Sequence, residues 1–281
     1  MATMPPMLTV IVPANNEAAR IGACLGAVVS SDWPHAAPVE VIVVSNGSVD
    51  DTAGAARALE PSFAARGWTL TILDREALGK PGALNAGDAQ ARAAMRLYLD
   101  ADVTVDPALL GQVADALAAE PARFASGRVD IAGTGWIARA YARFWAKVPF
   151  MRHGVPGCGL FAVNKAGRAR WDAFPPIIAD DLFARLSFAP AERVGVPAAY
   201  RWPIAEGFAR LVRVRRRQDA GVAEIATLFP EKLANEDKPP FPLGQKLRLA
   251  ASDPVGFLVY GAVALAVRLT PDANQGWSRG R

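Results

Sequence analysis

The sequence has 281 residues, which is enough for one large α/β domain with a tail, or at most for two small domains. Apolar residues make up 52% of the chain, so a sizeable core can be buried. With 31 basic and 27 acidic residues, the small positive charge excludes a dedicated nucleic-acid-binding protein, whose basic residues would cluster more strongly.

The first half of the chain alternates expected strands and helices. Apolar runs rich in β-branched residues predict strands over 8–13, 39–44, 68–73 and 97–99. Helices are expected over 17–30, 51–65 and from 79 onward. The strand ends recur at roughly thirty-residue intervals, the length of a βαβ unit, and right-handed crossovers place such ends on one edge of a sheet. The side chains expected along that edge are Pro13, Asn46, Asp74 and Asp100.

The second half is less regular. Helices are expected over 107–119 and 136–148, strands over 124–131, 160–163 and 194–200, and a basic helix or loop over 210–217. Charge and proline dominate residues 231–242, which we interpret as a linker. We therefore predict one domain over 1–230, made of two halves that meet near residues 105 and 106. Residues 231–281 would form the linker and an apolar helical tail.

Two carboxylates end the fourth expected strand. Asp100 and Asp102, separated by Ala101, would lie at the carboxyl edge of the sheet, where open α/β folds bind ligands. Such acids would repel one another unless neutralised, and a divalent cation bridging to nucleotide phosphates would do so. In the alternative interpretation, Asp100 begins a turn and Asp102 caps the next helix.

Other polar residues at the strand ends could serve the same nucleotide. Backbone groups at 13–15 could hydrogen-bond a base, and Asn46 could read a base edge or form a plain turn with Gly47. Gly79 and Lys80 open a helix whose outward amides could hold a phosphate or ribose, although a lone lysine is more often solvated.

A second acidic pair, Asp180 and Asp181, stands at an expected loop-to-helix junction. The helix dipole accounts for one of them, which leaves the other available as a general base. The arginine cluster is either a solvated face or a set of phosphate contacts, for which Arg213 and Arg217 are the candidates.

Four ordered motifs resemble those of family 2 glycosyltransferases, over about residues 7–220. They are VIVPANNE at 10–17, VVSNGSVDDT at 43–52, GKPGALNAG at 79–87 and DAD at 100–102. The pair at 180–181 falls where that family has Glu-Asp or Asp-Asp.

The resemblance implies a GT-A fold, which is an α/β architecture with a mostly parallel, Rossmann-like sheet flanked by helices. It also implies a nucleotide-sugar donor and a divalent ion, Mn²⁺ or Mg²⁺. The domain over 1–230 would then be the catalytic domain, with a nucleotide-sugar half to about residue 105 and an acceptor half from about 106. Asp102 would bind the metal, Asp100 the metal and the nucleotide, and Asp181 would be the base of an inverting displacement. The remaining donor-side residues would be Pro13, Ala14, Glu17, Asn46, Gly79, Lys80, Asn85 and Ala101; the acceptor side would comprise Gly157, Cys158, Gly159 and Asp180.

The chain also departs from the family pattern. Asn46 replaces an aspartate that commonly binds uracil, so the base of the donor stays open. The Gln-x-x-Arg-Trp signature of processive members is missing, which favours transfer of one sugar to a glycan or lipid-linked acceptor. Two alternatives remain: a sugar nucleotidyltransferase, which would have a glycine-rich loop after the first strand, and a catalytically silent nucleotide-binding protein.

Features outside the motifs bear on location. Cys24 and Cys158 lie in different contexts, so no disulfide framework is expected, which fits a reducing cytosol. Residues 1–8 lack the features of a signal peptide, and no apolar run approaches a spanning helix. The apolar run 255–267 is either a helix buried against the catalytic domain or an interfacial element on an anionic membrane. We therefore expect a cytoplasmic protein, with membrane contact through this tail as the open question.

Overall fold

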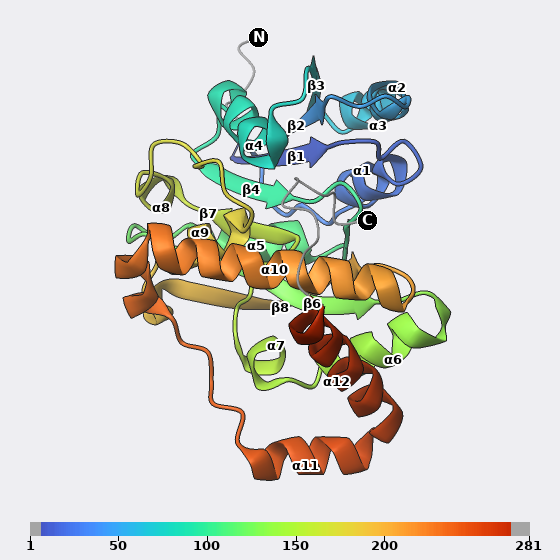
Figure 1. Cartoon of the computed structure of the whole chain (residues 1–281). Helices are drawn as coiled ribbons and strands as arrows, with labels where there is room; N and C mark the ends of the chain where they lie inside the picture. The colour runs from blue at the N-terminus through green and yellow to red at the C-terminus, as the bar shows by residue number, and fades with distance from the viewer. Residues whose placement is uncertain (1–6, 271–281) are drawn as a thin grey trace.

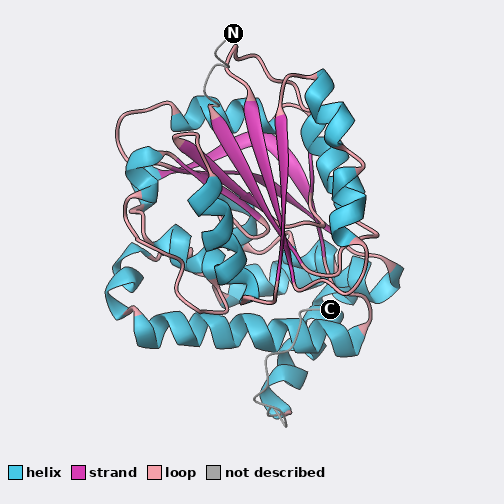
Figure 2. Cartoon of the chain, turned by 90° about the horizontal axis from the view of Figure 1, so that it is seen from above, coloured by secondary structure: helices cyan, strands magenta, loops and turns pink. Residues whose placement is uncertain are grey.

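One eight-stranded sheet runs through the protein, in the order β3-β2-β1-β4-β7-β6-β8-β5 (Figure 1). The structure is a computed structural model that describes residues 7–270. Residues 1–6 and 271–281, which include the end of the predicted tail, lie outside the described part. Helices cover both faces of the twisted sheet (Figure 2). The predicted α/β class is confirmed.

The first four strands are parallel, as the spacing of the motifs predicted. They are β1 (Leu8–Ala14), β2 (Val39–Asn46), β3 (Thr69–Arg75) and β4 (Met95–Leu99). β1 and β2 are buried along nearly their whole length, because helices pack on both faces and apolar side chains therefore serve both. Val10 and Val12 join the core on one face, whereas Ile11 joins the core on the other.

The connecting helices of this half include two that differ from the prediction. The helices of this half are α1 (Ile21–Val29), α2 (Thr52–Arg57), α3 (Glu60–Ala65) and α4 (Gly79–Gln90). The helix expected over 51–65 is two helices, because Pro61 has no amide hydrogen and cannot continue the first one. α1 begins four residues later than predicted, since Asn16 has a positive φ of 56° and the Glu17 amide donates to Thr52 Oγ1 at 2.9 Å.

The second half adds strands that reverse the direction of the sheet. β7 (Leu160–Val163) pairs antiparallel with β4 and with β6 (Phe124–Ala132). β8 (Arg193–Pro203) is parallel to β6, and the short β5 (Thr104–Val105) pairs antiparallel with β8. The strand that carries Asp100 and Asp102 at its end is therefore central, with the parallel strands on one side and the mixed strands on the other.

The remaining helices flank this mixed half and form the tail (Figure 1). They are α5 (Leu109–Leu117), α6 (Gly135–Trp145), α7 (Pro149–His153), α8 (Lys165–Arg168), α9 (Asp180–Leu186), α10 (Phe208–Leu228), α11 (Leu243–Ser252) and α12 (Pro254–Leu269). Two short 3₁₀ helices, η1 (Pro190–Glu192) and η2 (Pro230–Asn235), precede β8 and follow α10. Among residues 7–270, no helix is both long and apolar enough to cross a bilayer.

Candidate functional site

A tight turn after β4 presents the first acidic pair. The Val103 amide donates to the Asp100 carbonyl at 3.0 Å, so Asp100 does begin a turn. Asp102 does not cap a helix, because the chain continues into β5; that alternative is wrong. The side chain of Asp100 is 29% exposed, whereas Asp102 and Ala101 are buried, so one carboxylate faces solvent and the other is enclosed.

Lys80 joins the two acidic pairs. It lies in the first turn of α4, and its Nζ is 2.9 Å from Asp100 Oδ1 and 3.1 Å from Asp180 Oδ2. The interpretation of Lys80 as a solvated surface lysine is therefore wrong. Burial alone would lower the pKa of Lys80, but the carboxylates of Asp100, Asp180 and Asp181 raise it above its usual value. The ammonium group thus stays charged and holds together acids that are about eighty residues apart in the chain.

Asp180 and Asp181 form the first turn of α9, at the junction that the sequence predicted. Burial raises the pKa of Asp181 to about 6, and the neighbouring charge of Asp180 adds to this effect. The Leu182 amide donates to Asp181 Oδ1 at 2.8 Å and favours the ionised form. A carboxyl group with this pKa is mostly deprotonated at neutral pH and still basic enough to accept a proton.

The glycine loop before β7 lies against this site. Gly157 and Gly159 have positive φ values of 71° and 75°, and a Cβ on Gly159 would lie 2.6 Å from Cδ1 of Trp202. The Asp100 amide donates to the Gly159 carbonyl at 2.9 Å, and Tyr200 Oη donates to the Cys158 carbonyl at 2.7 Å. Burial, together with the charge of Asp181, raises the pKa of the Cys158 thiol and keeps it protonated.

Asn46, at the end of β2, binds the start of α4. Its Nδ2 donates to the Gly79 carbonyl at 3.0 Å, and its Oδ1 accepts from the Leu78 amide at 2.6 Å. Asn15 in turn donates to the Asn46 carbonyl at 2.6 Å. This side chain therefore does more than form a turn: it fixes the helix end that carries Lys80. Pro13 and Ala14 end β1, next to this group.

Asn85 and the arginines lie further from the acids. Asn85 Nδ2 donates to the Phe174 carbonyl at 3.0 Å, and Asn85 Oδ1 accepts from the Phe174 amide at 2.7 Å. These bonds hold α4 against the segment that leads to α9. α10 packs closely on the same segment. If Gly221 carried a Cβ atom, this atom would lie only 2.9 Å from Cβ of Ala179. Arg217 precedes Gly221 by one helical turn and so lies on that face, and Arg213 is exposed one turn before it.

Some features of the site were not predicted from the sequence. The bridging role of Lys80 depends on contacts between three distant segments, and no sequence pattern indicates it. Tyr200 was predicted only as the last residue of a strand, and Trp202 was not predicted to belong to any element. In the structure both support the glycine loop. Their aromatic side chains at the end of a strand would have been the available indication.

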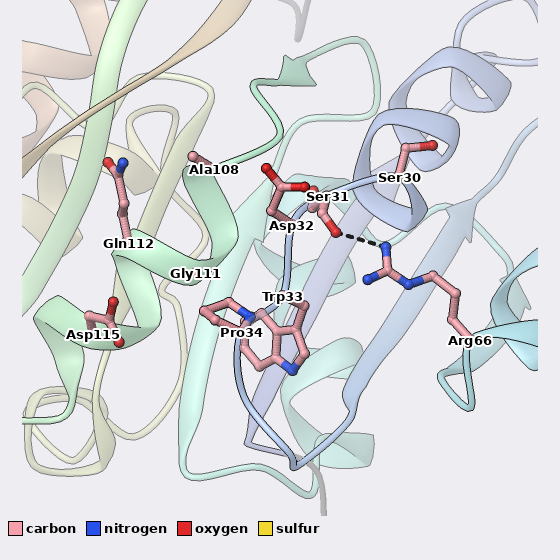
Figure 3. A pocket seen from close by; sticks show the side chains of 10 residues that line it. All are labelled: Ser30, Ser31, Asp32, Trp33, Pro34, Arg66, Ala108, Gly111, Gln112 and Asp115. Atoms are coloured by element: carbon pink, nitrogen blue, oxygen red, sulfur yellow. Dashed lines mark hydrogen bonds between the residues drawn. The ribbon is translucent and has the colours of Figure 1, made fainter.

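A separate pocket of about 470 Å³ lies away from this site (Figure 3). It is formed by the residues that precede β2 together with α5. It therefore opens at the amino ends of the parallel strands, whereas the acidic pairs lie at their carboxyl ends. Arg66 Nη1 donates to the Ser31 carbonyl there at 2.7 Å. The pocket contains none of the predicted site residues.

Asp100 and Asp102 offer the hard oxygen ligands that a divalent cation prefers. Within the described part of the chain, no cluster of three His, Cys, Asp or Glu side chains could hold a metal alone. Two carboxylates are an incomplete ligand set, so an ion held by them would need further oxygen ligands from a bound molecule.

Comparison with known proteins finds similarity to glycosyltransferases. The model of the family described as Glycosyl transferase family 2 matches residues 9–163. Glycosyltransferase AglE of Haloferax volcanii is 38% identical over 103 residues, which cover 36% of this chain and 32% of that protein. A 4,4'-diaponeurosporenoate glycosyltransferase of Staphylococcus aureus is 30% identical over 171 residues, covering 60% of this chain and 42% of its own. The chain thus spans less than half the length of these two relatives.

Solved structures of glycosyltransferases share the fold, which confirms the predicted GT-A arrangement. A mannosyltransferase from Pyrobaculum calidifontis, in complex with GDP-Man and Mn²⁺, has a TM-score of 0.57 and 24% identity, and the match covers 96% of this chain and 77% of that one. S. aureus TarS in complex with UDP has a TM-score of 0.53 and 13% identity, with 98% and 95% covered.

Proposed function

Because the chain belongs to glycosyl transferase family 2, we propose that it transfers one sugar from a nucleotide-diphosphate sugar to an acceptor hydroxyl, with inversion at the anomeric carbon. The observation that carries the proposal is the bridge made by Lys80. It brings Asp100, on the donor side, and the Asp180–Asp181 pair, on the acceptor side, into one site. A donor and an acceptor held there would meet within reach of a base.

The donor would occupy the ends of β1, β2 and β4. Asp100 and Asp102 would hold Mn²⁺ or Mg²⁺, which when bound stabilises negative charge on the diphosphate leaving group. A relative of the same fold binds GDP-Man with Mn²⁺, which supports this arrangement. The donor-side residues would be Pro13, Ala14, Glu17, Asn46, Gly79, Lys80, Asn85 and Ala101, with Asn46 and Asn85 acting through the backbone that they hold.

Asp181 would be the catalytic base. Its carboxylate takes the proton of the acceptor hydroxyl while the hydroxyl oxygen attacks the anomeric carbon on the face opposite the diphosphate. The bond to the diphosphate breaks with its electron pair, so the nucleoside diphosphate leaves and the configuration inverts. Asp180 would stay ion-paired with Lys80 near the acceptor, beside the loop Gly157–Cys158–Gly159.

The arginines of α10 would complete the diphosphate site. Arg217, on the helix face that packs against the segment before α9, would contact a phosphate, and Arg213 lies one turn further out. The acceptor would be a glycan or a lipid-linked hydroxyl in polysaccharide or glycolipid assembly. The enzyme would work in the cytoplasm, at the cytoplasmic face of a membrane that its tail contacts, in keeping with its two free thiols.

Replacing the base tests the proposal. In Asp181→Asn, turnover should fall on the order of 100- to 10,000-fold, because the general base is lost, while donor affinity stays within about threefold. The measurement is release of nucleoside diphosphate from UDP-, GDP- and dTDP-sugars with Mn²⁺, alongside donor binding by calorimetry.

Asp180→Asn is the matched control, since it removes the adjacent carboxylate; it should keep more turnover than Asp181→Asn. An inactive Asp180→Asn beside a fully active Asp181→Asn would move the base by one residue. Release of pyrophosphate from a nucleoside triphosphate and a sugar 1-phosphate, with no nucleoside diphosphate formed from the nucleotide sugars, would instead identify a nucleotidyltransferase. Donor binding without any turnover in the wild type would identify a silent binding protein.

A further inference from the structure

α12 has two apolar faces, and residues 7–270 cover only one of them. The covered face packs against α6 and α10, where Val263 is fully buried among Tyr141, Leu211 and Val212. Asp253 caps the helix by accepting from the Gly256 amide at 3.0 Å. The interpretation of the tail as a helix buried against the catalytic domain thus accounts for one face of α12 and leaves the other unexplained.

The opposite face carries an uninterrupted apolar stripe. Its residues follow one another at intervals of three and four, which places them in a row along the helix. They are Val255, Leu258, Ala262, Leu265 and Leu269, and we call them the docking stripe. The leucines are 67%, 56% and 69% exposed, and no charged residue interrupts the row. A row of this length leaves a large apolar area in contact with water unless something covers it.

α11 extends this surface. It has no buried residue, and Figure 1 shows it projecting from the rest of the molecule next to α12. Leu243 and Leu247, one turn apart, are 70% and 60% exposed. Lys246 and Arg248 lie to either side of these leucines around the helix. An apolar face bordered by basic residues is the pattern of helices that lie in a membrane interface.

The charge of the tail is one-sided. Residues 238–270 contain the basic residues Lys238, Lys246, Arg248 and Arg268. The only acid in this stretch, Asp253, is 5% exposed and bound to Arg143 at 2.7 and 2.8 Å and to Lys147 at 3.1 Å. Lys238 is ion-paired with Glu236 at 4.0 Å. The accessible charge of α11 and α12 is therefore basic, which anionic lipid headgroups would neutralise.

We propose that the docking stripe and the leucine face of α11 lie flat on an anionic lipid membrane. α12 has 16 residues, about 24 Å of helix, whereas the hydrocarbon core is about 30 Å thick; with one face held by the protein, it lies in the interface and does not span it. A second copy of the chain is the less favoured occupant, because pairing two such surfaces would bring their basic residues together. The inference does not depend on the sugar-transfer reaction.

Sedimentation of the full chain with vesicles tests it. At low salt, the protein should sediment with vesicles of phosphatidylglycerol and phosphatidylcholine at least tenfold more than with phosphatidylcholine alone, and the difference should shrink at 0.5 M salt. Leu258→Gln with Leu265→Gln should reduce sedimentation at least tenfold. The matched control is Val222→Gln with Leu228→Gln, two exposed apolar residues of α10, which should sediment like the wild type.

A second variant, Lys246→Gln with Arg248→Gln, alters only exposed side chains and so keeps the test valid if the leucine variant melts early. It should weaken binding to the anionic vesicles and flatten the salt dependence. Absence of sedimentation by the wild type at low salt overturns the proposal, as does unchanged sedimentation of both tail variants. A wild-type dimer in solution that the leucine variant converts to a monomer would assign the docking stripe to a second copy.

Discussion

The ammonium of Lys80 lies between two carboxylates that have few other partners for their charge. The side chain of Asp180 is 4% exposed, so removing Lys80 would leave this charge buried without its counter-ion. Breaking a buried ion pair costs about 3–5 kcal/mol, and the partial exposure of Lys80 and Asp100, near one third each, brings the expected cost toward the lower end of that range.

We therefore expect Lys80→Met to lower the free energy of unfolding by about 3 kcal/mol in urea denaturation. The same variant should weaken donor binding, because Asp100 would no longer be held in place. Lys80→Arg, which keeps the charge, is the control and should lose less on both measurements. An unchanged denaturation midpoint in Lys80→Met would mean that the bridge contributes nothing to the fold.

The pKa of Asp181 gives a pH dependence with a definite sign. Because burial raises this pKa to about 6, the proposed base is protonated below that value. We expect kcat/KM to fall about tenfold per pH unit below pH 6 and to level off above it. A profile measured in Asp180→Asn should shift to lower pH, since the charge that helps raise the pKa is gone; a flat wild-type profile from pH 5 to 8 would contradict the assignment.

The same shift affects stability. The folded protein binds this proton more tightly than the unfolded chain, whose aspartates titrate near 3.9. The contribution of Asp181 to stability is therefore highest below about pH 4 and falls as the pH rises through about 6. Thermal melts should show Asp181→Asn gaining stability relative to the wild type on going from pH 4 to pH 8, because the ionised carboxylate of the wild type destabilises the folded state.

At the scale of single residues, the sequence predicted which side chains gather but not how they bond. Asp100 and Asp181 could be placed because strand ends and helix starts follow from local patterns. The partners of Lys80 and Asn46 could not, since each depends on distances between segments that only the assembled sheet determines.

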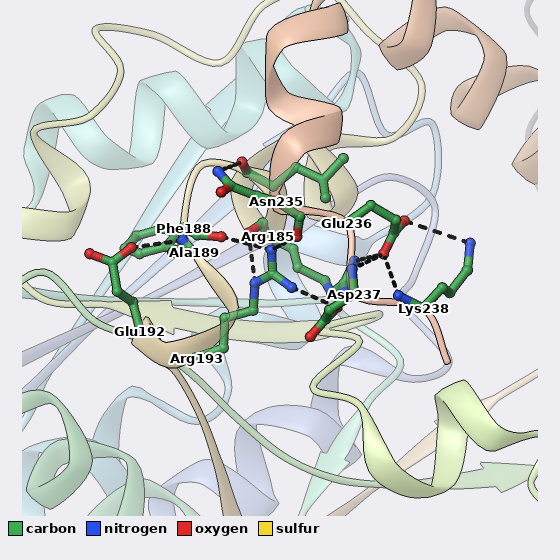
Figure 4. Close-up of polar contacts among 10 residues, drawn as sticks. Arg185, Phe188, Ala189, Glu192, Arg193, Asn235, Glu236, Asp237 and Lys238 are labelled. Atoms are coloured by element: carbon green, nitrogen blue, oxygen red, sulfur yellow. Dashed lines mark hydrogen bonds and ion pairs between the residues drawn. The ribbon is translucent and has the colours of Figure 1, made fainter. Parts of the chain in front are cut away.

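Between elements, the end of η2 and the following segment are fixed by two buried arginines (Figure 4). Arg185, on α9, pairs with Glu236 at 2.9 Å and with Asp237, and Arg193, on β8, pairs with Asp237 at 2.8 Å. The arginine side chains are 0% and 1% exposed. Part of the predicted linker is thus bound to the helix that begins with Asp180 and Asp181.

Asp237→Ala should lower the free energy of unfolding by about 3 kcal/mol, because it leaves both guanidinium groups buried with one carboxylate fewer. Urea denaturation measures the change. Asp237→Asn is the control: it keeps the oxygen that accepts from both arginines and should lose less. If Asp237→Ala denatures within about 0.5 kcal/mol of the wild type, the contacts are those of an ordinary surface pair.

Elements with strong local patterns were predicted to within one or two residues at most ends, as β2 illustrates. β-branched runs favour strands by themselves, whatever lies next to them. β5 could not be predicted, because two residues become a strand only through pairing with β8. Pro61 indicates the split between α2 and α3, but the residues around it favour a helix, so one continuous helix was predicted.

For the whole molecule, the sequence predicted the parallel half of the sheet and its common edge. The antiparallel insertion of β7 next to β4 was not predictable, because hydrophobic runs indicate strands but not their neighbours or direction. The sheet continues through the boundary predicted near residue 105, so the two expected halves share one hydrogen-bonded layer.

The central place of β4 has a consequence during synthesis on the ribosome. Leu99 emerges about 60 residues before Leu160, its partner on β7. At about 5–20 residues per second, the nascent chain would carry an unpaired edge of β4 for about three to twelve seconds. Such an edge is a template for pairing with another chain, so translation speed and chaperone supply should govern the yield of folded protein. Nascent chains halted between these two points should aggregate most readily.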